Sequence, residues 1–365
     1  MSVNSILSRY IARQFLVSFG GLLVILTGLI WLIEFIELVR RVNSQPDGTI
    51  SQALQLSLLK VPETLNMLFH FAVLFAGMFT FWRLTRSQEL IVVRAAGVSV
   101  WQFLKPVILV AVALGIIKVT MFNPIGAALQ SRFVELENRY IRGYSSILEV
   151  SPFGIWLRQE TEGGVQVLYA ERTEPDRIAL QNVIIFQYDS DGIFVDRTDA
   201  DTAELTQGEW IIEDAWRTIG LAQPEFVGAY RLPTELTQAS IENSFAPPDT
   251  LSFWDLPEFI DTLEETGFST VRHRLYFNSL LSQPLMMAVM ILFAAAFSLR
   301  VNTRRGGGTL MVLAGLTTAF SLFVLNDVVF ALGLAETIPT VLAAWTPAGV
   351  SMLIAIATLL HMEDG

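Results

Sequence analysis

Two adjacent arginines, Arg40 and Arg41, follow a long apolar segment of this 365-residue chain and could bind an anionic group. A guanidinium carries a planar fork of donors, so it binds phosphate in a bidentate, charge-assisted way. Beside a membrane, that phosphate would belong to a lipid headgroup. The alternative is an ordinary helix end at which both side chains are simply solvated.

Polar side chains also interrupt the apolar segments themselves. Glu34 precedes the arginine pair, and Asn326 and Asp327 lie deep in a later segment. A charge inside a bilayer costs free energy, so such residues usually contact a substrate or another helix. One interpretation is that these residues make a polar contact within the helix bundle or with a substrate headgroup. The alternative is that the carboxylates are paired and only hold helices together. Lys118 is expected to extend its ammonium group to the membrane surface.

A more polar stretch between two apolar segments, residues 83–99, is predicted to form a short helix. Ser87 can cap its first turn and Gly97 can end it. A short helix across the mouth of a bundle suits docking into a soluble partner, whereas the alternative is a structural loop. The residues expected to take part are Arg86, Ser87, Glu89, Leu90, Val93, Arg94 and Gly97, with Leu90, Val93 and Arg94 on one face.

The chain shows no constellation of catalytic residues. Its one glycine cluster, Gly306–Gly308, lacks the Lys and the following Ser/Thr of a phosphate-binding loop, so we expect no nucleotide hydrolysis by this chain. The three histidines are far apart and cysteine is absent, so no metal site is expected. Ser57 and Lys60 match the Ser-x-x-Lys pattern of acylating enzymes, but the companion motifs are missing. We therefore predict no catalytic residue, no metal and no cofactor in the chain itself.

The composition indicates that the positioning elements are membrane helices. Only 16% of the residues are charged and 52% are hydrophobic, whereas a soluble protein is about one quarter charged. Crossing a bilayer takes about 20 mostly apolar residues in a helix. Six stretches qualify: Phe15–Ile36, Leu65–Trp82, Phe103–Phe122, Leu275–Leu299, Leu310–Leu332 and Ile338–Leu360. Leu54–Leu59 extends the second past Pro62, where a kink is expected.

The distribution of basic residues predicts the orientation of these spans. Lys and Arg collect before the first span, between the second and third, and between the fourth and fifth. Such residues favour the cytoplasmic side of a membrane, so both termini are predicted to be cytoplasmic. Arg40, Arg41 and Lys60 fall on the opposite side. An anionic partner there would explain this exception.

Residues 123–271 separate the spans into two sets of three and have a different composition. They hold 26 of the 35 acidic and 9 of the 24 basic residues. Seven short runs alternate apolar and polar residues, as half-buried strands do, and a sandwich or jelly roll is expected. An amphipathic helix is predicted at Leu256–Thr266, capped by Asp255 and ended by Gly267. The predicted fold is a six-helix (3+3) membrane protein over residues 1–122 and 272–365, with an all-β, jelly-roll-like domain inserted at 123–271.

Residues 87–97, Ser-Gln-Glu-Leu-Ile-Val-Val-Arg-Ala-Ala-Gly, resemble a signature of the lipopolysaccharide-export ABC permeases, the LptF/LptG family. This sequence carries one extra residue, Gln88, or a shifted register. Further similar motifs occur along the whole chain, and the C-terminal ones are closer to the LptG member than to LptF. They are Arg9–Ile11, Val61-Pro62, Gln283–Leu285, Val324–Asp327 and Trp345–Pro347.

The resemblance implies a permease in the inner membrane of a Gram-negative bacterium that extracts lipopolysaccharide from the outer leaflet. Its expected partners are a second, LptF-like permease, a cytoplasmic LptB-like ATPase dimer that binds ATP and Mg, an LptC-like periplasmic bridge protein, lipopolysaccharide and membrane lipids. Nucleic acid is not an expected partner. The segment near 84–98 would be the coupling helix that enters the ATPase, and Arg40 and Arg41 match a basic pair at the lateral gate. Phe69, Phe71 and Phe75 could line the lipid cavity, although such a stripe is more often helix packing.

Two departures from the family pattern concern the headgroup site. Glu34 and Glu63 stand where family members often carry basic residues. The predicted headgroup site therefore consists of Arg40, Arg41, Glu34 and Glu63, and it contains both positive and negative side chains. The acidic pair would suit a substrate with fewer phosphates, or contacts bridged by divalent cations. One rival function is a membrane sensor or scaffold with a periplasmic ligand-binding domain, but such a protein needs a cytoplasmic output domain and none is expected from the sequence. The other rival is a lipid-modifying enzyme that uses Ser57 and Lys60.

Overall fold

Six of the helices in a computed structural model of the chain are long and apolar enough to cross a membrane, within the residues that the structure describes. They confirm the six predicted spans and extend most of them. The structure describes residues 3–44, 49–95, 97–137, 140, 148–151, 154–161, 164–174, 177–189, 192–206, 208–220, 222–234, 247–300 and 307–363. Arg304 and Arg305, two of the basic residues between the fourth and fifth spans, lie outside these residues.

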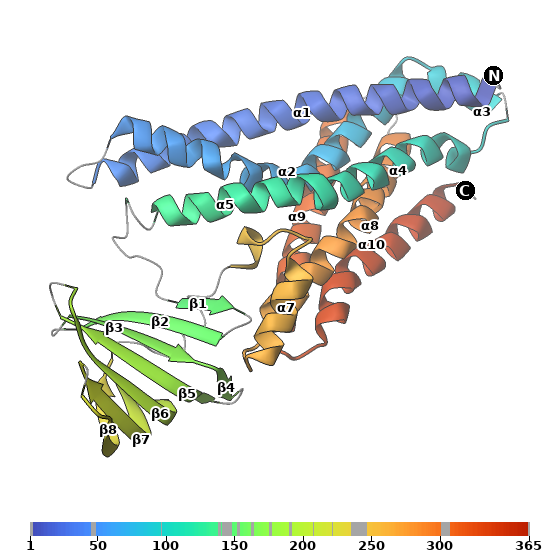
Figure 1. Ribbon diagram of the computed structural model, residues 1–365. Helices are drawn as coiled ribbons and strands as arrows, with labels where there is room; N and C mark the ends of the chain where they lie inside the picture. The colour runs from blue at the N-terminus through green and yellow to red at the C-terminus, as the bar shows by residue number, and fades with distance from the viewer. Residues whose placement is uncertain are drawn as a thin grey trace. The chain divides into compact units, whose positions relative to one another are not determined.

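The first two spans are long helices that pack side by side (Figure 1). Helix α1 covers Val3–Val42 and helix α2 covers Ile50–Arg86, running on through Pro62. The start of α2 is fixed by a capping box. The Thr49 hydroxyl accepts a hydrogen bond from the Gln52 amide, and the Gln52 side chain accepts one from the Thr49 amide.

The third span is one continuous helix built from three pieces. Helix α4 (Val100–Ile117) passes through a π-helical turn at Lys118–Phe122 into helix α5 (Asn123–Glu137). A π-helical turn adds a residue to the hydrogen-bonded ring and often occurs at functional sites. Residues 123–141 belong to the same compact unit as the membrane helices, together with 252–254 and 274–365. The helical unit therefore continues beyond residue 122, where the sequence placed the domain boundary.

The other three spans complete this unit, and several glycines allow the helices to approach closely. Helices α8, α9 and α10 cover Val271–Arg300, Gly307–Leu334 and Thr340–Glu363. A Cβ atom built on Gly115 would lie 2.6 Å from the Pro284 Cα atom, and one on Gly77 would lie 2.9 Å from the Ala294 Cβ atom. Membrane helices associate mainly through such close packing, because lipid provides no hydrophobic drive for association.

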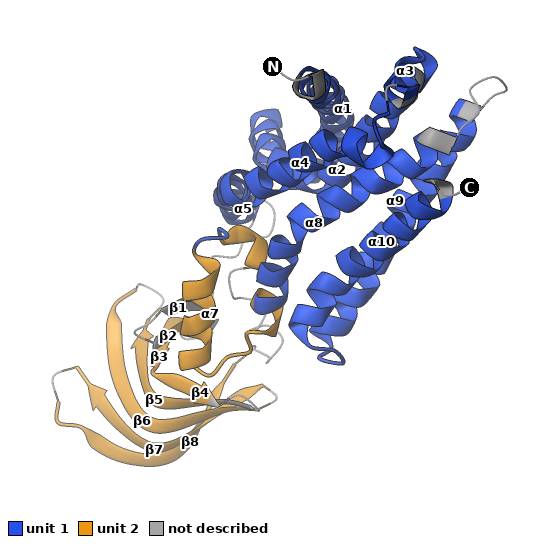
Figure 2. Cartoon of the chain, turned by 90° about the vertical axis from the view of Figure 1, so that its right-hand side faces the viewer, with its two compact units in different colours: residues 1–141, 252–254, 274–365 blue, residues 142–251, 255–273 orange. Residues whose placement is uncertain are grey.

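The second compact unit, residues 142–251 and 255–273, is an antiparallel sheet with one helix beside it (Figure 2). An inserted all-β domain was predicted and is confirmed. The described strands are β1 (Leu148–Ser151), β2 (Gly154–Thr161), β3 (Gly164–Ala170), β4 (Arg172–Glu174), β5 (Arg177–Tyr188), β6 (Phe194–Thr206), β7 (Glu209–Ile219) and β8 (Glu225–Pro233). They form a single curved sheet in the order β1-β2-β3-β5-β6-β7-β8, with β4 paired to β5.

The strand predictions differ from the structure mainly at β6. The sequence suggested separate strands at Ile193–Arg197 and Ala203–Thr206, whereas one strand runs through both. The intervening residues alternate in burial, so they continue the same pleat. The predicted helix is α7 (Leu256–Glu265), and Gly267 ends it with a φ of +82°. Asp255 occupies the N-cap position, although its side chain makes no capping hydrogen bond.

Candidate functional site

A hollow of about 200 Å³ lies between helices α1, α2 and α5, near the C-terminal ends of α1 and α5. Its wall combines acidic, basic and apolar side chains. They are Glu34, Glu37, Leu38, Arg41, Lys60, Glu63, Gln130, Phe133, Val134 and Glu137. The structure therefore brings together three of the four residues that the sequence assigned to a headgroup site: Glu34, Arg41 and Glu63.

Glu34 connects helices α1 and α2. Its Oε2 atom accepts a hydrogen bond of 2.8 Å from the Thr64 hydroxyl, and its Oε1 atom lies 3.7 Å from the Lys60 ammonium nitrogen. The same ammonium group lies 5.9 Å from the centre of the Phe133 ring on α5. Through these contacts the Glu34 carboxylate joins helices α1 and α2. Lys60, which the sequence treated as an exception to the charge pattern and as part of the Ser-x-x-Lys pattern, lines the hollow.

Arg41 also spans two helices, whereas Arg40 does not line the hollow. Arg41 forms an ion pair with Glu37 on its own helix and lies 3.9 Å from a carboxylate oxygen of Glu137 on α5. Arg40 is exposed beside it. The two arginines therefore do not form one phosphate clamp in this arrangement of the chain.

The charged side chains of the hollow have an acidic excess. Four carboxylates, from Glu34, Glu37, Glu63 and Glu137, face two cations, from Arg41 and Lys60. A phosphate group that binds here must replace a carboxylate as the ion-pair partner of Arg41 or Lys60, or must bind such a cation together with the carboxylate. Mixed charge at this place is consistent with the sequence departures at Glu34 and Glu63.

We expect Thr64→Val to loosen the contact between α1 and α2. Valine has the same shape as threonine but cannot donate a hydrogen bond to Glu34, and a bond to a charged group is worth roughly 1.5–3 kcal/mol when buried. Because Glu34 keeps about a fifth of its surface exposed, the expected loss of stability is nearer the lower value. The thermal unfolding midpoint of the purified chain in detergent measures this loss.

A matched control for this prediction is Thr358→Val on α10. Thr358 is partly exposed, and among the hydrogen bonds described its hydroxyl donates only to the backbone oxygen of Ile354 in its own helix. Equal midpoints for both variants would contradict a role of Thr64 in joining the two helices.

The predicted coupling segment is a short helix, α3 (Glu89–Ala95), connected to α2 by a sharp turn. Gln88, the extra residue of the motif, has a φ of +61° and forms this turn. Ser87 caps the end of α2 instead of the start of α3, so the predicted N-cap is wrong. Its hydroxyl donates a 2.8 Å hydrogen bond to the Glu89 carboxylate. Gly97 follows the helix with a φ of +80°, as its predicted role requires.

Leu90 and Val93 share a face of α3, as predicted, and that face packs against the core of the helical unit. Leu90 is 7% exposed and belongs to the core of the helical unit, with Val93 packed against the same core. Val92 is 68% exposed. The side chain of Arg94 lies outside the described residues, and the guanidinium of Arg86 lies 5.2 Å from the centre of the Trp82 ring. Leu90 and Val93 therefore anchor the helix, and Val92, which the sequence reasoning missed, is its outward apolar residue.

Lys118 does not extend to a membrane surface, because it is 4% exposed inside the helical unit. Its ammonium nitrogen donates hydrogen bonds to the Gln283 Oε1 atom at 2.9 Å and to the Asn66 backbone oxygen at 3.2 Å. It also lies 5.4 Å from the centre of the Phe69 ring. The prediction of a snorkelling lysine is therefore wrong. The π-helical turn that begins at Lys118 places the side chain inward.

The three candidate cavity phenylalanines have different surroundings. Phe69 is 5% exposed and packs edge-on against Phe19, with the ring centres 5.0 Å apart. Phe75 packs against the core, and Phe71 lines a small pocket together with Asn326. Asp327, the next residue on α9, is exposed on the surface of the chain.

The strand-rich unit holds a separate ion pair in which the carboxylate is buried and the arginine is half-exposed. Asp196 on β6 is 2% exposed and accepts two hydrogen bonds from the Arg217 guanidinium on β7. These bonds raise the pKa of Arg217 above its usual value. Burial raises the pKa of Tyr230 on the neighbouring strand β8. Both shifts keep the groups in their usual protonation states at neutral pH, so this pair is a structural element. No cluster of metal-ligating side chains occurs among the residues that the structure describes.

Comparison with known proteins gives a match along nearly the whole chain. The family model described as "Lipopolysaccharide export system permease LptF/LptG" matches residues 9–361. A Haemophilus influenzae protein named "Lipopolysaccharide export system permease protein LptG" is 25% identical over 353 residues, covering 93% of this chain and 94% of that protein. An Escherichia coli protein of the same name is 23% identical over 377 residues, covering 99% of both chains.

Proposed function

The chain belongs to the LptF/LptG family of lipopolysaccharide export permeases, and from this we propose that it extracts lipopolysaccharide from the outer leaflet of the inner membrane and passes it to a periplasmic protein bridge. It is a multi-pass membrane component of an ABC transporter for lipopolysaccharide export, and its family contributes the permease and not the catalytic chain. The observation that carries the proposal is the match over residues 9–361, which includes both sets of three spans and the inserted sheet.

The proposed energy source is a separate cytoplasmic ATPase dimer that binds ATP and Mg. Helix α3 is the proposed contact, because it is fixed to the helical core by Leu90 while Val92 faces outward. An apolar side chain that projects from a rigid short helix suits a socket on a partner protein. In this arrangement both termini are cytoplasmic and the strand-rich unit is periplasmic, where it would hand lipid to the LptC-like bridge.

The proposed mechanism is differential stabilisation of two states of the permease pair. ATP closes the ATPase, and α3 transmits this closure to the helices of this chain and of a second, LptF-like permease. The closed state leaves less room for lipid between the two permeases, so the acyl chains move toward the periplasmic unit. Arg41 and Lys60 hold the headgroup phosphates in the hollow, and the acidic side chains of the wall limit how many phosphates bind at once.

Co-purification tests the proposed assembly. When this chain carries an affinity tag and is extracted from its native membrane in mild detergent, we expect an ATPase chain and a second permease of similar size to elute with it in a stable complex. Elution of this chain with neither partner would refute the transporter assignment. Mass spectrometry of the eluate identifies the partners without assuming their sequences.

We expect Glu63→Lys to raise lipid-stimulated ATPase activity of the assembled complex, by about two- to fivefold at low lipopolysaccharide concentration. The estimate follows from about 0.5–1 kcal/mol for one partly exposed charge pair. The reversal removes one negative charge from the wall of the hollow and adds a cation for phosphate. Combining it with Glu34→Lys tests the second acidic position, although this change also breaks the bond to Thr64.

The matched control is Glu336→Lys, which makes the same charge change on the loop between α9 and α10, away from the hollow. Repeating the assay with a chelator separates direct phosphate binding from binding through divalent cations. If Glu63→Lys and the double reversal leave the lipid dependence unchanged, these acidic residues do not contact the headgroup.

A further inference from the structure

Three residues, Ser252–Trp254, belong to the helical unit, although the chain on both sides of them belongs to the strand-rich unit (blue in Figure 2). They follow a short 3₁₀ helix, Pro248–Thr250, and directly precede α7. The chain thus leaves the sheet, returns to the helical unit for three residues and then forms α7. We call Ser252–Trp254 the strap.

Asn123 holds the strap by its backbone. The Asn123 Oδ1 atom accepts a hydrogen bond of 2.6 Å from the Phe253 amide, and its Nδ2 atom donates one of 3.3 Å to the Tyr276 hydroxyl on α8. Because a backbone amide can only donate, this orientation of the side chain is fixed. Asn123 is 8% exposed and is the residue at which the π-helical turn passes into α5. One buried side chain therefore connects the third span, the strap and the fourth span.

Trp254 joins the strap to the π-helical turn itself. Its indole N–H donates a hydrogen bond of 3.2 Å to the backbone oxygen of Thr120. In an α-helix this oxygen accepts a hydrogen bond from the residue four positions later, but that residue is Pro124, which has no N–H. Trp254 therefore supplies a donor to an oxygen that has no α-helical partner.

Aromatic packing adds to these hydrogen bonds. The Phe253 ring is stacked on Phe277 of α8, with the ring centres 5.4 Å apart. It also packs edge-on against Trp254, at a centre-to-centre distance of 5.1 Å. Such ring pairs stabilise a contact beyond the burial of their area. The strap is thus bound to the third span mainly by hydrogen bonds and to the fourth span mainly by ring stacking.

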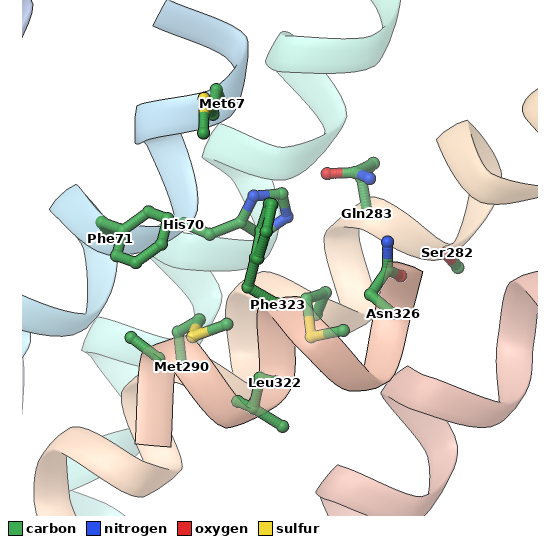
Figure 3. A pocket seen from close by; sticks show the side chains of 11 residues that line it. Met67, His70, Phe71, Ser282, Gln283, Met290, Leu322, Phe323 and Asn326 are labelled. Atoms are coloured by element: carbon green, nitrogen blue, oxygen red, sulfur yellow. The ribbon is translucent and has the colours of Figure 1, made fainter. Parts of the chain in front are cut away.

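The π-helical turn that carries the strap is fixed on its inner side as well. Lys118, its first residue, is 4% exposed and donates hydrogen bonds to the Gln283 side chain and to the Asn66 backbone oxygen. The Gln283 side chain also forms a hydrogen bond with His70, and both line the small pocket shown in Figure 3. The strap is therefore attached to a part of the third span that is itself tied to α2 and α8.

Beyond the strap, α7 is tied to the sheet and to the start of α8. The Thr173 amide on β4 donates a hydrogen bond of 3.0 Å to the Thr266 backbone oxygen at the C-terminal end of α7. A Cβ atom on Gly267 would lie 2.0 Å from the Thr173 oxygen, so the chain passes this strand closely. The Phe259 ring of α7 lies 5.0 Å from the His273 ring in the first turn of α8. A displacement of α7 must therefore displace the sheet.

We propose that Asn123 and Trp254 are positioning residues for the transfer of lipid to the strand-rich unit. Through the strap they fix the N-terminal end of α7 to the third and fourth spans, and α7 fixes the sheet. When these spans change their angle, the receiving sheet follows the helices that deliver the lipid. The alternative is a strap that only supports folding of the chain. The proposal rests on the proposed function, because it concerns the delivery step of that function.

Two photocrosslinking positions separate delivery from extraction. A benzophenone at Val134, in the headgroup hollow, reports lipid that has left the membrane. A benzophenone at Leu232, which is partly buried against the core of the sheet, reports lipid that has reached the strand-rich unit. The complete transporter, with the second permease and the ATPase, is reconstituted in nanodiscs that contain lipopolysaccharide and is supplied with ATP. The ratio of lipopolysaccharide adducts at Leu232 to those at Val134 measures delivery.

Two substitutions weaken the strap to different degrees. Trp254→Phe keeps an aromatic ring and removes only the indole N–H, so we expect a ratio about two- to tenfold lower, the effect of one hydrogen bond. Asn123→Leu removes two hydrogen bonds at similar volume and should lower the ratio further. Adducts at Val134 and lipid-stimulated ATPase activity should stay unchanged in Trp254→Phe. Trp345→Phe, the same change at an exposed position on α10, should leave the ratio as in the wild-type chain.

A covalent strap provides a rescue experiment, since the chain contains no cysteine. Asn123→Cys combined with Phe253→Cys removes the hydrogen bond between these neighbouring positions and should lower the ratio. Joining the two thiols with a short crosslinker restores the attachment, and the ratio should return to that of the wild-type chain. A joined strap that blocks delivery would overturn the proposal, because the strap would then have to open during transfer.

Equal ratios for the wild-type chain, Trp254→Phe and Asn123→Leu would also overturn the proposal. So would an equal loss of adducts at Val134 and Leu232, because the strap would then only support folding. Lipopolysaccharide adducts at Val134 but none at Leu232 in the wild-type chain would refute the delivery step. No lipopolysaccharide adduct at either position would refute the proposed function itself.

Discussion

Val92→Asp is expected to abolish lipid-stimulated ATP hydrolysis by the assembled transporter while this chain remains folded in the membrane. Val92 is 68% exposed on a helix whose opposite face is packed into the core through Leu90. Buried at the interface with the ATPase, an aspartate would have no partner, and an unpaired buried charge costs about 3 kcal/mol or more. That cost corresponds to an affinity roughly 100-fold lower. Activity of the purified complex and retention of the ATPase on the tagged chain both measure it.

Ser99→Asp is the matched control for this prediction. It introduces the same charge in the same connecting segment, and an aspartate can retain the N-cap hydrogen bond that Ser99 makes with the Gln102 amide. Leu90→Asp should behave differently from Val92→Asp, because it disturbs the core and lowers the amount of folded chain. Full ATPase retention and activity in Val92→Asp would mean that the exposed face of α3 is not the coupling surface.

Gly115→Leu should prevent the third span from packing against the fourth. Even a single Cβ atom at Gly115 would lie 2.6 Å from the Cα atom of Pro284, and backbone cannot move aside as a side chain can. Overpacking a tight contact usually costs about 1–3 kcal/mol, and a leucine against backbone should reach at least the upper value. We expect little of this variant to elute as a monodisperse species in fluorescence-detected size-exclusion chromatography.

Gly349→Leu on α10 provides the comparison, because no atom lies within 4 Å of a Cβ built at Gly349. It adds the same side chain in a membrane helix and should elute like the wild-type chain. A normal elution profile for Gly115→Leu would show that α4 and α8 are not in the close contact described.

The elements of this fold could be predicted from sequence because each depends on a local pattern. Six apolar stretches gave six spans, and the alternation in residues 154–232 predicted most of the strands. The long strand β6 was divided in the prediction because the residues between its two halves, 198–202, are mostly polar, although Thr198 faces inward as Asp196 does. Their partners, among them Arg217 for Asp196, are on other strands, and a pattern within one strand cannot show them.

The sites depend on contacts between distant residues, and fewer of their features could be predicted. The sequence identified Arg41, Glu34 and Glu63, but Lys60 and Glu137 joined the hollow only through the packing of α2 and α5 against α1. Lys118 was expected at the membrane surface because lysines near helix ends usually extend there. The π-helical turn and the partner Gln283, 165 residues away, hold it inside. For the coupling helix, the motif identified the segment but not its orientation, which Leu90 sets by entering the core.

Photocrosslinking at Val134 in living cells tests the central claim most directly. Val134 lines the hollow beside Arg41 and Lys60 without taking part in its ion pairs. If this chain moves lipopolysaccharide through the hollow, a benzophenone at Val134 forms a lipopolysaccharide adduct that accumulates when ATP hydrolysis is blocked. A benzophenone at Leu353, which is 70% exposed on α10, gives the background of general membrane contact. Phospholipid adducts alone at both positions would contradict the assignment of this chain as a lipopolysaccharide permease.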